Sequence, residues 1–117
     1  MRHNKEPRKS AALDKLEAVE KPAGVFRTTL SFHEQSMLCH FKLTRGSVIP
    51  LHNHGAVQHG YVLRGKIRFL LHEGESFEAI EGSSYVFDPW EHHGAEVLED
   101  SEVLEFFTPM RPEYVDN

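Results

Sequence analysis

Two histidines and a glutamine are spaced like metal ligands in the stretch PLHNHGAVQHGYVLRG at residues 50–65. His52 and His54 are two residues apart, so in an extended chain both imidazoles point to the same face. Gln58 follows four residues later, after a small Gly-Ala-Val bend that can return its amide to the same cavity. Because neutral imidazole is the commonest protein ligand for transition metals, the stretch predicts a site for a divalent metal ion.

A distant group is needed to close such a site, and a second glycine-bounded piece offers one. This piece, GSSYVFDPWEHHG at residues 82–94, contains His92 and His93. Three imidazoles and one amide oxygen can hold a divalent ion and leave room for water or substrate, and catalytic metal sites keep an open position of this kind. Either histidine supplies the required ligand type.

The elements that must position these ligands are predicted to be short strands. From Gly24 onward, runs rich in Val, Ile, Phe, Leu and Thr are separated by turn residues about every eight to twelve positions, which is typical of an all-β sandwich or barrel. The pieces LRGKI at 63–67 and HEGES at 72–76 predict tight hairpin turns in which glycine takes a positive φ. Strands are expected at residues 25–32, 36–43, 46–49, 58–63, 66–72, 76–80, 84–88, 94–98 and 103–108.

The N-terminal segment has a different pattern. Three apolar residues spaced three apart, between a serine and a proline, predict a short helix over residues 10–21. This helix belongs to an N-terminal tail over residues 1–22. The strands are expected to form one domain over residues 23–117, since a chain of 117 residues has room for a single core.

Composition and charge exclude several classes of protein. Cys39 is the only cysteine, so neither an intrachain disulfide nor a cysteine-based zinc finger can form. No apolar run approaches the roughly 20 residues that span a bilayer, and the basic N-terminus is not followed by a signal-like apolar stretch. We therefore expect a cytoplasmic protein without a membrane partner. The net charge of −5 argues against nucleic acid, whose phosphates bind clustered Lys and Arg.

These residues and their spacing resemble the two sequence motifs of the small single-domain members of the cupin superfamily. The first motif is matched by Gly46, His52, His54, Gln58 and Gly65, with glutamine where glutamate is usual. The second is matched by Gly82, Pro89 and His93, with Trp90 where glycine is common. The resemblance covers residues 23–115 and implies an antiparallel jelly-roll barrel. It also implies that His52, His54, Gln58 and His93 hold the metal.

The remaining histidines are expected to lie outside the site. His59 and His92 each neighbour a proposed ligand and should face the opposite side of the strand. The histidines expected to be solvated are His3, His33, His40 and His72. Neutral ligands, Gln58 included, leave the full charge on a metal ion, which favours an anionic ligand or a developing oxyanion. Ligand type does not select among Mn, Ni, Zn and Fe.

The last expected strand, SEVLEFFTPMRPEYVDN, contains an acidic residue between apolar ones. Glu105 either points into the cavity or faces water while its neighbours fill the core, and alternation leaves both open. The ending EFFTPMRPEY is similar to that of the small cupins that convert 4,5-unsaturated monouronates of pectin and alginate to keto form. The resemblance implies that Glu105 moves a proton, Phe107 forms an apolar wall and Arg111 grips the substrate carboxylate, with Glu105 where aspartate is usual.

Three functions remain open. The first is a metal-dependent enzyme that acts on a small, anionic, carboxylate-bearing sugar derivative. Its most concrete form is ketonisation of a 4,5-unsaturated uronate. The second is an Fe-dependent dioxygenase, since an open histidine-rich site suits oxygen chemistry. The third is a non-catalytic module that binds a small molecule. A homodimer is expected because closed twofold pairs are the commonest oligomers.

Overall fold

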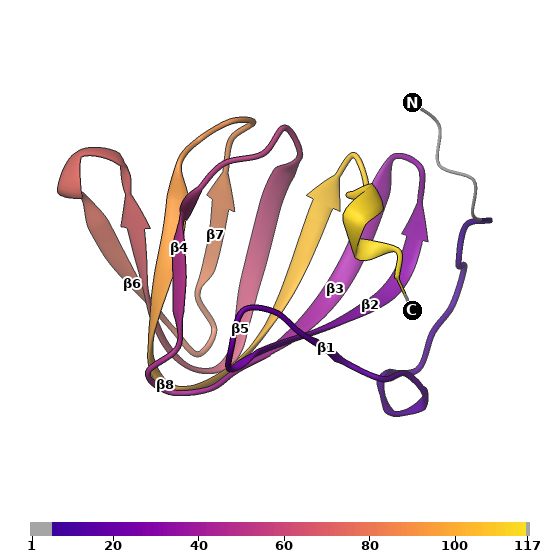
Figure 1. The fold of residues 1–117 in the computed structure, drawn as a ribbon, viewed down its shortest axis with the longest axis horizontal. Coiled ribbons are helices and arrows are strands. Elements are labelled where there is room, and N and C mark those ends of the chain that lie inside the picture. The colour runs from indigo at the N-terminus through magenta and orange to yellow at the C-terminus, as the bar shows by residue number, and fades with distance from the viewer. Residues whose placement is uncertain (1–5, 117) are drawn as a thin grey trace.

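Two long, bent strands, β5 and β8, organise the computed structural model, which describes residues 6–116 (Figure 1). They pair antiparallel from Val57 opposite Thr108 to Leu71 opposite His93. The strands are β1 (Val19–Glu20), β2 (Val25–His33), β3 (Ser36–Leu43), β4 (Val48–His52), β5 (Val57–Leu71), β6 (Ser76–Ile80), β7 (Ser84–Phe87) and β8 (His93–Thr108). Short 3-10 helices are η1 (Leu13–Lys15), η2 (His72–Gly74) and η3 (Pro112–Tyr114).

The shorter strands extend β5 and β8 into two facing layers. In one layer, β7 pairs with the first half of β5, β3 pairs with the second half of β8, and β2 and β1 follow β3. In the other layer, β6 pairs with the second half of β5, and β4 with the first half of β8. Figure 1 shows β4 and β6 on the left and β2 and β3 on the right. The predicted antiparallel all-β sandwich is confirmed.

Alternation along the strands fills the space between the layers. The odd-numbered residues of β3 from Met37 to Leu43 are buried, whereas Lys42 is exposed. Near β6, the ring centroid of Phe69 lies 4.3 Å from that of Tyr85, within an aromatic cluster. Because removing apolar area from water contributes about 25 cal/mol per Å², this interior supplies most of the driving force that holds the two layers together.

The hairpin turn predicted at residues 63–67 is wrong, because β5 continues through this stretch. Its pairing with β8 shifts register between Val62 and Ile67. Gly65 has a φ of +102°, and a Cβ added there would lie 2.6 Å from the carbonyl oxygen of Asp100. The glycine therefore permits a bend and a close approach between strands rather than a chain reversal. The turn predicted at residues 72–76 is confirmed, since η2 connects the paired strands β5 and β6.

The helix predicted over residues 10–21 is also wrong. The segment contains only the single turn η1, and its end pairs with β2 as strand β1. Leu13 is 41% exposed, so the apolar stripe has little surface to pack against. Short helices gain most of their stability from packing, whereas an extended segment gains hydrogen bonds from the edge of a sheet. Arg8 forms a similar isolated bridge with Phe32.

His40 was expected to be solvated, and this prediction is wrong. It lies in β3, which pairs with β2 on one side and with β8 on the other, and it is only 4% exposed. Its Nε2 atom is 2.9 Å from a carboxylate oxygen of Glu102, and the Arg64 Nε–H donates to the other oxygen at 2.6 Å. The hydrogen bond from Arg64 is the largest of the effects that hold the pKa of Glu102 below its usual range. His33 and His72 are exposed as predicted, and His3 lies outside the described residues.

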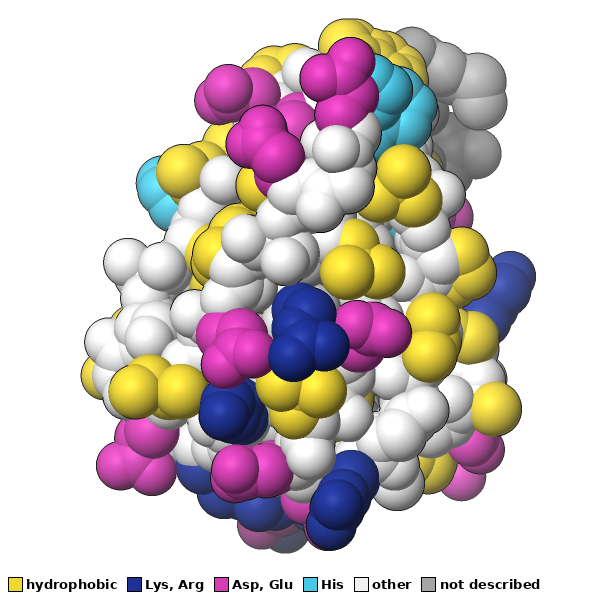
Figure 2. All heavy atoms as spheres, turned by 90° about the vertical axis from the view of Figure 1, so that its left-hand side faces the viewer, with side chains coloured by type: hydrophobic (Ala, Val, Ile, Leu, Met, Phe, Trp, Pro, Cys, Tyr) yellow, Lys and Arg dark blue, Asp and Glu magenta, His cyan; other side chains and the backbone are white. Residues whose placement is uncertain are grey.

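Ion pairs connect the strands on the outer surface of the second layer. Arg68 of β5 reaches Glu78 of β6 at 3.0 Å and Glu96 of β8 at 3.4 Å. In the lower half of the face seen in Figure 2, acidic and basic side chains lie next to one another, whereas the acidic side chains at the top have no Lys or Arg of the described residues beside them. Within residues 6–116, no helix is both long enough and apolar enough to cross a membrane.

The glycine at the bend predicts a stability difference between two alanine variants. Gly65 and Gly74 both have a positive φ, but a Cβ at Gly74 would meet no atom within 4 Å. Gly74→Ala should therefore cost about 1 kcal/mol of unfolding free energy, from backbone strain alone. Gly65→Ala should cost about 3 kcal/mol, because strain and steric overlap add. Urea unfolding measures both, and equal losses would contradict the role given to the bend.

Candidate metal centre

Three histidines converge where β4, the loop after it and the start of β8 meet. His52 ends β4 and pairs directly with His93, the first residue of β8. His54 follows in the loop, and its ring centroid lies 5.0 Å from that of His93. One ring nitrogen from each of the three histidines lies within 4.8 Å of the others. The structure thus brings together all three histidines that the sequence assigned to the metal.

Main-chain carbonyls orient the three imidazole rings. In each ring the Nδ1 atom lies 2.8 to 2.9 Å from a carbonyl oxygen two residues away: Pro50 for His52, Ala56 for His54 and Glu91 for His93. A carbonyl only accepts hydrogen bonds, so the Nδ1 atom of each neutral ring carries the proton. The Nε2 lone pairs remain available for binding. Backbone contacts of this kind typically fix the tautomer of metal-bound histidines.

The Gln58 side chain lies beside the three histidines, and its contact with Glu105 determines which of its amide atoms faces them. The amide nitrogen donates to a Glu105 carboxylate oxygen at 2.7 Å, so the amide oxygen faces the histidines. That oxygen lies 3.0 Å from Nε2 of His54 and 3.2 Å from Nε2 of His93. With both Nδ1 atoms protonated, the Nε2 lone pairs of the two neutral rings and the lone pairs of the Gln58 oxygen point toward one another with no proton between them. A divalent cation can accept all of these lone pairs, so the donor set fits a transition metal.

Glu105 points into the interior, which decides the question that strand alternation left open. Its side chain is buried, and Tyr85 donates its hydroxyl hydrogen to the same oxygen as Gln58, also at 2.7 Å. Burial raises the pKa of Glu105, against the opposing effects of these two hydrogen bonds and the charge of Arg111. Burial also raises the pKa of the Tyr85 hydroxyl well above its usual value. The carboxyl group is therefore a desolvated group of the cavity.

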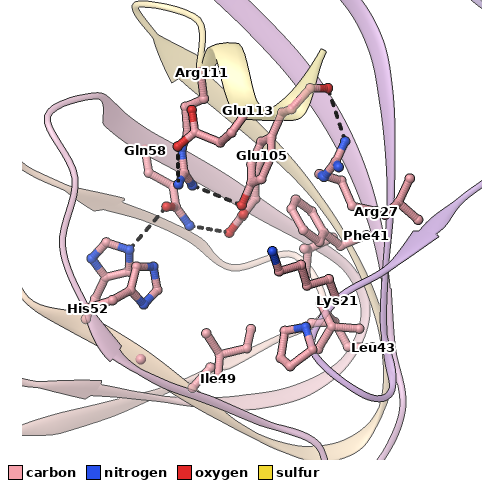
Figure 3. A pocket seen from close by; sticks show the side chains of 18 of the residues that line it. Lys21, Arg27, Phe41, Leu43, Ile49, His52, Gln58, Glu105, Arg111 and Glu113 are labelled. Carbon is pink, nitrogen blue, oxygen red and sulfur yellow. Dashed lines mark hydrogen bonds and ion pairs between the residues drawn. The ribbon is translucent and has the colours of Figure 1, made fainter. Parts of the chain in front are cut away.

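Arg111 lies at the same end of the cavity as Gln58 and Glu105 (Figure 3). Its guanidinium donates to the Tyr114 hydroxyl at 2.9 Å and to Glu113 at 3.1 Å. It lies 4.3 Å from the ring centroid of Tyr114 and 5.4 Å from that of Phe107. Its Nε is buried and has no hydrogen-bond partner in the described part of the chain. The residue is held by η3, yet it retains an unused donor.

A cavity of about 380 Å³ connects the histidines to Arg111. Five predicted site residues line it: His52, Gln58, His93, Glu105 and Arg111. His54 and Phe107 do not; the Phe107 ring, 1% exposed, lies 6.0 Å from that of His54 and supports it from behind. Phe107 was predicted as a cavity wall, and in the structure it is a packing residue under the centre.

Six polar residues of the cavity were missed from the sequence. They are Lys21, Arg27, Tyr85, Glu113, Tyr114 and Asp116. The alternation of Tyr85 and Phe87 in β7 is a signal that could have found Tyr85, since both side chains are buried. Nothing local marks Lys21 and Arg27, because they reach the cavity through the pairing of β1 with β2. His59 and His92 are exposed, as predicted.

Burial keeps two of the histidines neutral. It lowers the pKa of His93 to about 4, with further lowering by the charges of His52, His54 and Arg111. Burial, and then the charge of Arg111, lower the pKa of His54. Neutral imidazole is the form that binds a metal ion. The lowered pKa values therefore keep His54 and His93 in the form that can bind a metal ion.

Comparisons with known proteins agree with this fold. The family model described as the cupin domain matches residues 39–108. KdgF from Halomonas sp. is 30% identical, with a TM-score of 0.82, covering 89% of this chain and 97% of that chain. An RmlC-like cupin from Shewanella frigidimarina is 23% identical, with a TM-score of 0.84 and coverages of 91% and 95%.

A more distant structure shares the fold alone. The polyketide cyclase RemF from Streptomyces resistomycificus is 20% identical, with a TM-score of 0.74, covering 89% of this chain and 81% of that chain. A search of the curated proteins finds no match.

The lowered pKa of His93 predicts a pH-dependent stability of the metal-free protein. In the unfolded chain histidine titrates near 6.5, whereas folded His93 titrates near 4. Between these values the unfolded state binds more protons, so the free energy of unfolding should fall with falling pH, by up to about 1.4 kcal/mol per unit. Urea unfolding of chelator-treated protein measures the slope. His93→Ala should flatten it and His92→Ala should not; identical slopes in both variants would contradict the prediction.

The convergent lone pairs predict which histidines bind metal. His54→Ala should weaken binding of Mn²⁺, Ni²⁺, Zn²⁺ or Fe²⁺ by more than about 100-fold, beyond the loss typical for a partner outside the ligand shell. His59→Ala is the matched control, because His59 is exposed on the neighbouring strand β5. Isothermal titration calorimetry gives both affinities. Similar affinities in the two variants would reject the assigned centre.

Proposed function

The chain belongs to the cupin-domain family, and from this premise we propose that it is a metal-dependent enzyme acting on a small, carboxylate-bearing sugar derivative. The reaction that we propose is conversion of a 4,5-unsaturated monouronate to its keto form. One observation carries the proposal: neutral metal ligands, a buried carboxyl group and an arginine surround a single cavity. The similarity of the ending EFFTPMRPEY to the uronate-ketonising cupins supports the choice of substrate.

Arg111 is the proposed anchor for the substrate carboxylate. Its guanidinium is held by Tyr114 and Glu113, and its buried Nε–H has no other partner within residues 6–116. A planar guanidinium that lines the cavity suits a carboxylate, which accepts charge-assisted hydrogen bonds. The substrate would then extend from Arg111 toward the histidines.

Glu105 is the proposed proton carrier. Burial raises the pKa of this carboxyl group, so it binds a proton more readily than an exposed glutamate does, and general acid–base catalysis uses carboxyl groups shifted in this direction. In the proposed reaction the C1 hydroxyl loses its proton as the bond from C1 to the ring oxygen breaks, which gives an aldehyde and an enol at C5. The enol then loses its hydroxyl proton and C4 gains a proton, which gives the ketone. Glu105 is proposed to accept and return these protons. A divalent ion bound by His52, His54, Gln58 and His93 would supply Lewis-acid polarisation of the substrate oxygens.

The wider setting is proposed with the function. The metal is Mn, Ni, Zn or Fe, the protein is cytoplasmic, and it is a homodimer. The dimer is supported by exposed apolar side chains of Tyr61, Val86 and Phe106 on one outer face of the first layer. Exposed apolar side chains grouped on one face are typical of protein interfaces.

The ketonisation proposal predicts a metal-dependent loss of ultraviolet absorbance from an unsaturated monouronate. Protein loaded with Mn²⁺, Ni²⁺, Zn²⁺ or Fe²⁺ should exceed the spontaneous rate, and Glu105→Gln should lower kcat/KM by at least about 100-fold at unchanged metal content. Glu99→Gln, at an exposed position of β8, is the matched control. If no metal form exceeds the spontaneous rate, the uronate assignment is wrong. Oxygen uptake by the Fe form, or ligand-induced thermal stabilisation without turnover, would then favour the dioxygenase or the binding module.

A further inference from the structure

Tyr85 and Gly60 lie next to Glu105, and neither the family motif nor the proposed reaction assigns them a role. Gly60 of β5 pairs with Tyr85 of β7 on one side and with Glu105 of β8 on the other. The three residues thus form one row across three strands, with the same side toward the interior. Gly60 occupies the middle of this row without a side chain.

The vacant side-chain position at Gly60 lets the tyrosine reach across its strand. A Cβ added at Gly60 would overlap the Tyr85 phenol at Cζ, Cε1 and the hydroxyl oxygen. The phenol therefore lies over the Gly60 backbone, and its hydroxyl reaches the Glu105 carboxylate at 2.7 Å. The ring is 6% exposed and is held further by Phe69, with centroids 4.3 Å apart. Tyr85 is consequently a rigid donor with a single acceptor.

Glu105 transmits this constraint to Gln58. Tyr85 and Gln58 donate to the same oxygen, Oε2, each at 2.7 Å. An amide presents an oxygen on one side and a nitrogen on the other, and only the oxygen can bind a cation. A carboxylate fixed beside the nitrogen keeps the oxygen on the side of the histidines. Glutamate is also one methylene longer than the aspartate usual at this position, so it has more rotamers to be restricted.

We propose that Tyr85 is a positioning residue for the metal centre. Across Gly60, its hydroxyl holds Glu105 in place, and Glu105 holds the Gln58 amide with its oxygen toward His54 and His93. The inference rests on the proposed metal site but not on the proposed substrate. It assigns Glu105 a second role, as an acceptor that orders a ligand, which is separate from any proton transfer.

Cobalt binding tests the role of the tyrosine without any substrate. Tyr85→Phe, which removes only the hydroxyl, should weaken Co²⁺ binding by 10- to 100-fold, the usual cost of losing a partner outside the ligand shell. It should also change the visible Co²⁺ spectrum, which reports coordination geometry. Tyr61→Phe is the matched control, since Tyr61 is exposed one residue beyond Gly60 on β5. A lower melting temperature with unaltered Co²⁺ affinity and spectrum would mean a structural role only, and would overturn the proposal.

Variants at Glu105 test whether Tyr85 acts through it, and keep the proposal falsifiable if Tyr85→Phe does not fold. Glu105→Gln retains an acceptor oxygen and should keep Co²⁺ affinity within about 3-fold, whereas Glu105→Leu removes it and should lose at least as much as Tyr85→Phe. Adding Tyr85→Phe to Glu105→Leu should cause little further loss. Equal affinities of Glu105→Gln and Glu105→Leu, or a full additional loss in the double variant, would overturn it.

The same measurements separate this inference from the proposed function. A wild-type protein that binds no Co²⁺ would reject both the metal centre and the positioning role. A wild-type protein that binds Co²⁺, with the expected losses in Tyr85→Phe and Glu105→Leu, supports the positioning role even if every metal form fails to convert the uronate. In that case only the proposed reaction would be wrong.

Discussion

Burial of one carboxyl group, that of Glu105, is the constraint from which the rest of the site follows. An isolated charge inside a protein is costly unless it is hydrogen-bonded or paired. Two donors, Tyr85 and Gln58, meet one of its oxygens, and the charge of Arg111 acts on it from the cavity. Each of these contacts restricts a second group. The carboxyl group thereby fixes the amide of Gln58, and through it the position of an oxygen beside the histidines.

The two bent strands make this arrangement possible. β5 carries Gln58 and Gly60 in its first half, and β8 carries His93 at its start and Glu105 near its end. Because β8 passes from one layer to the other, a histidine and a carboxyl group twelve residues apart in the sequence reach the same cavity. The bend near Gly65 is therefore a requirement of the site as much as of the fold. A hairpin at that position would have divided β5 and separated the two layers.

Much of the centre could be predicted because it depends on short spacings. His52 and His54 share a face through the two-residue period of a strand, and the motif spacing selects His93 over His92. The direction of Glu105 could not be predicted, since alternation shows that two residues share a face but not which face is inside. Lys21, Arg27 and His40 were missed or misplaced for a related reason. The burial of Arg27 and His40, and the position of exposed Lys21 beside the cavity, come from strands that pair only in the folded molecule, which local sequence does not encode.

The charges around the cavity explain why a neutral fourth ligand suits this chain. Arg27 pairs with Asp116 and Arg111 with Glu113, whereas Lys21 takes part in none of the ion pairs among residues 6–116. A glutamate at position 58 would place a second carboxylate against Glu105, at the contact that the amide nitrogen now makes at 2.7 Å. Like charges at that distance repel strongly in a desolvated site. Glutamine avoids the repulsion, donates to Glu105 and still presents an oxygen to a cation. The positive charge of a bound metal then remains available, together with Lys21 and Arg111, to attract an anionic ligand.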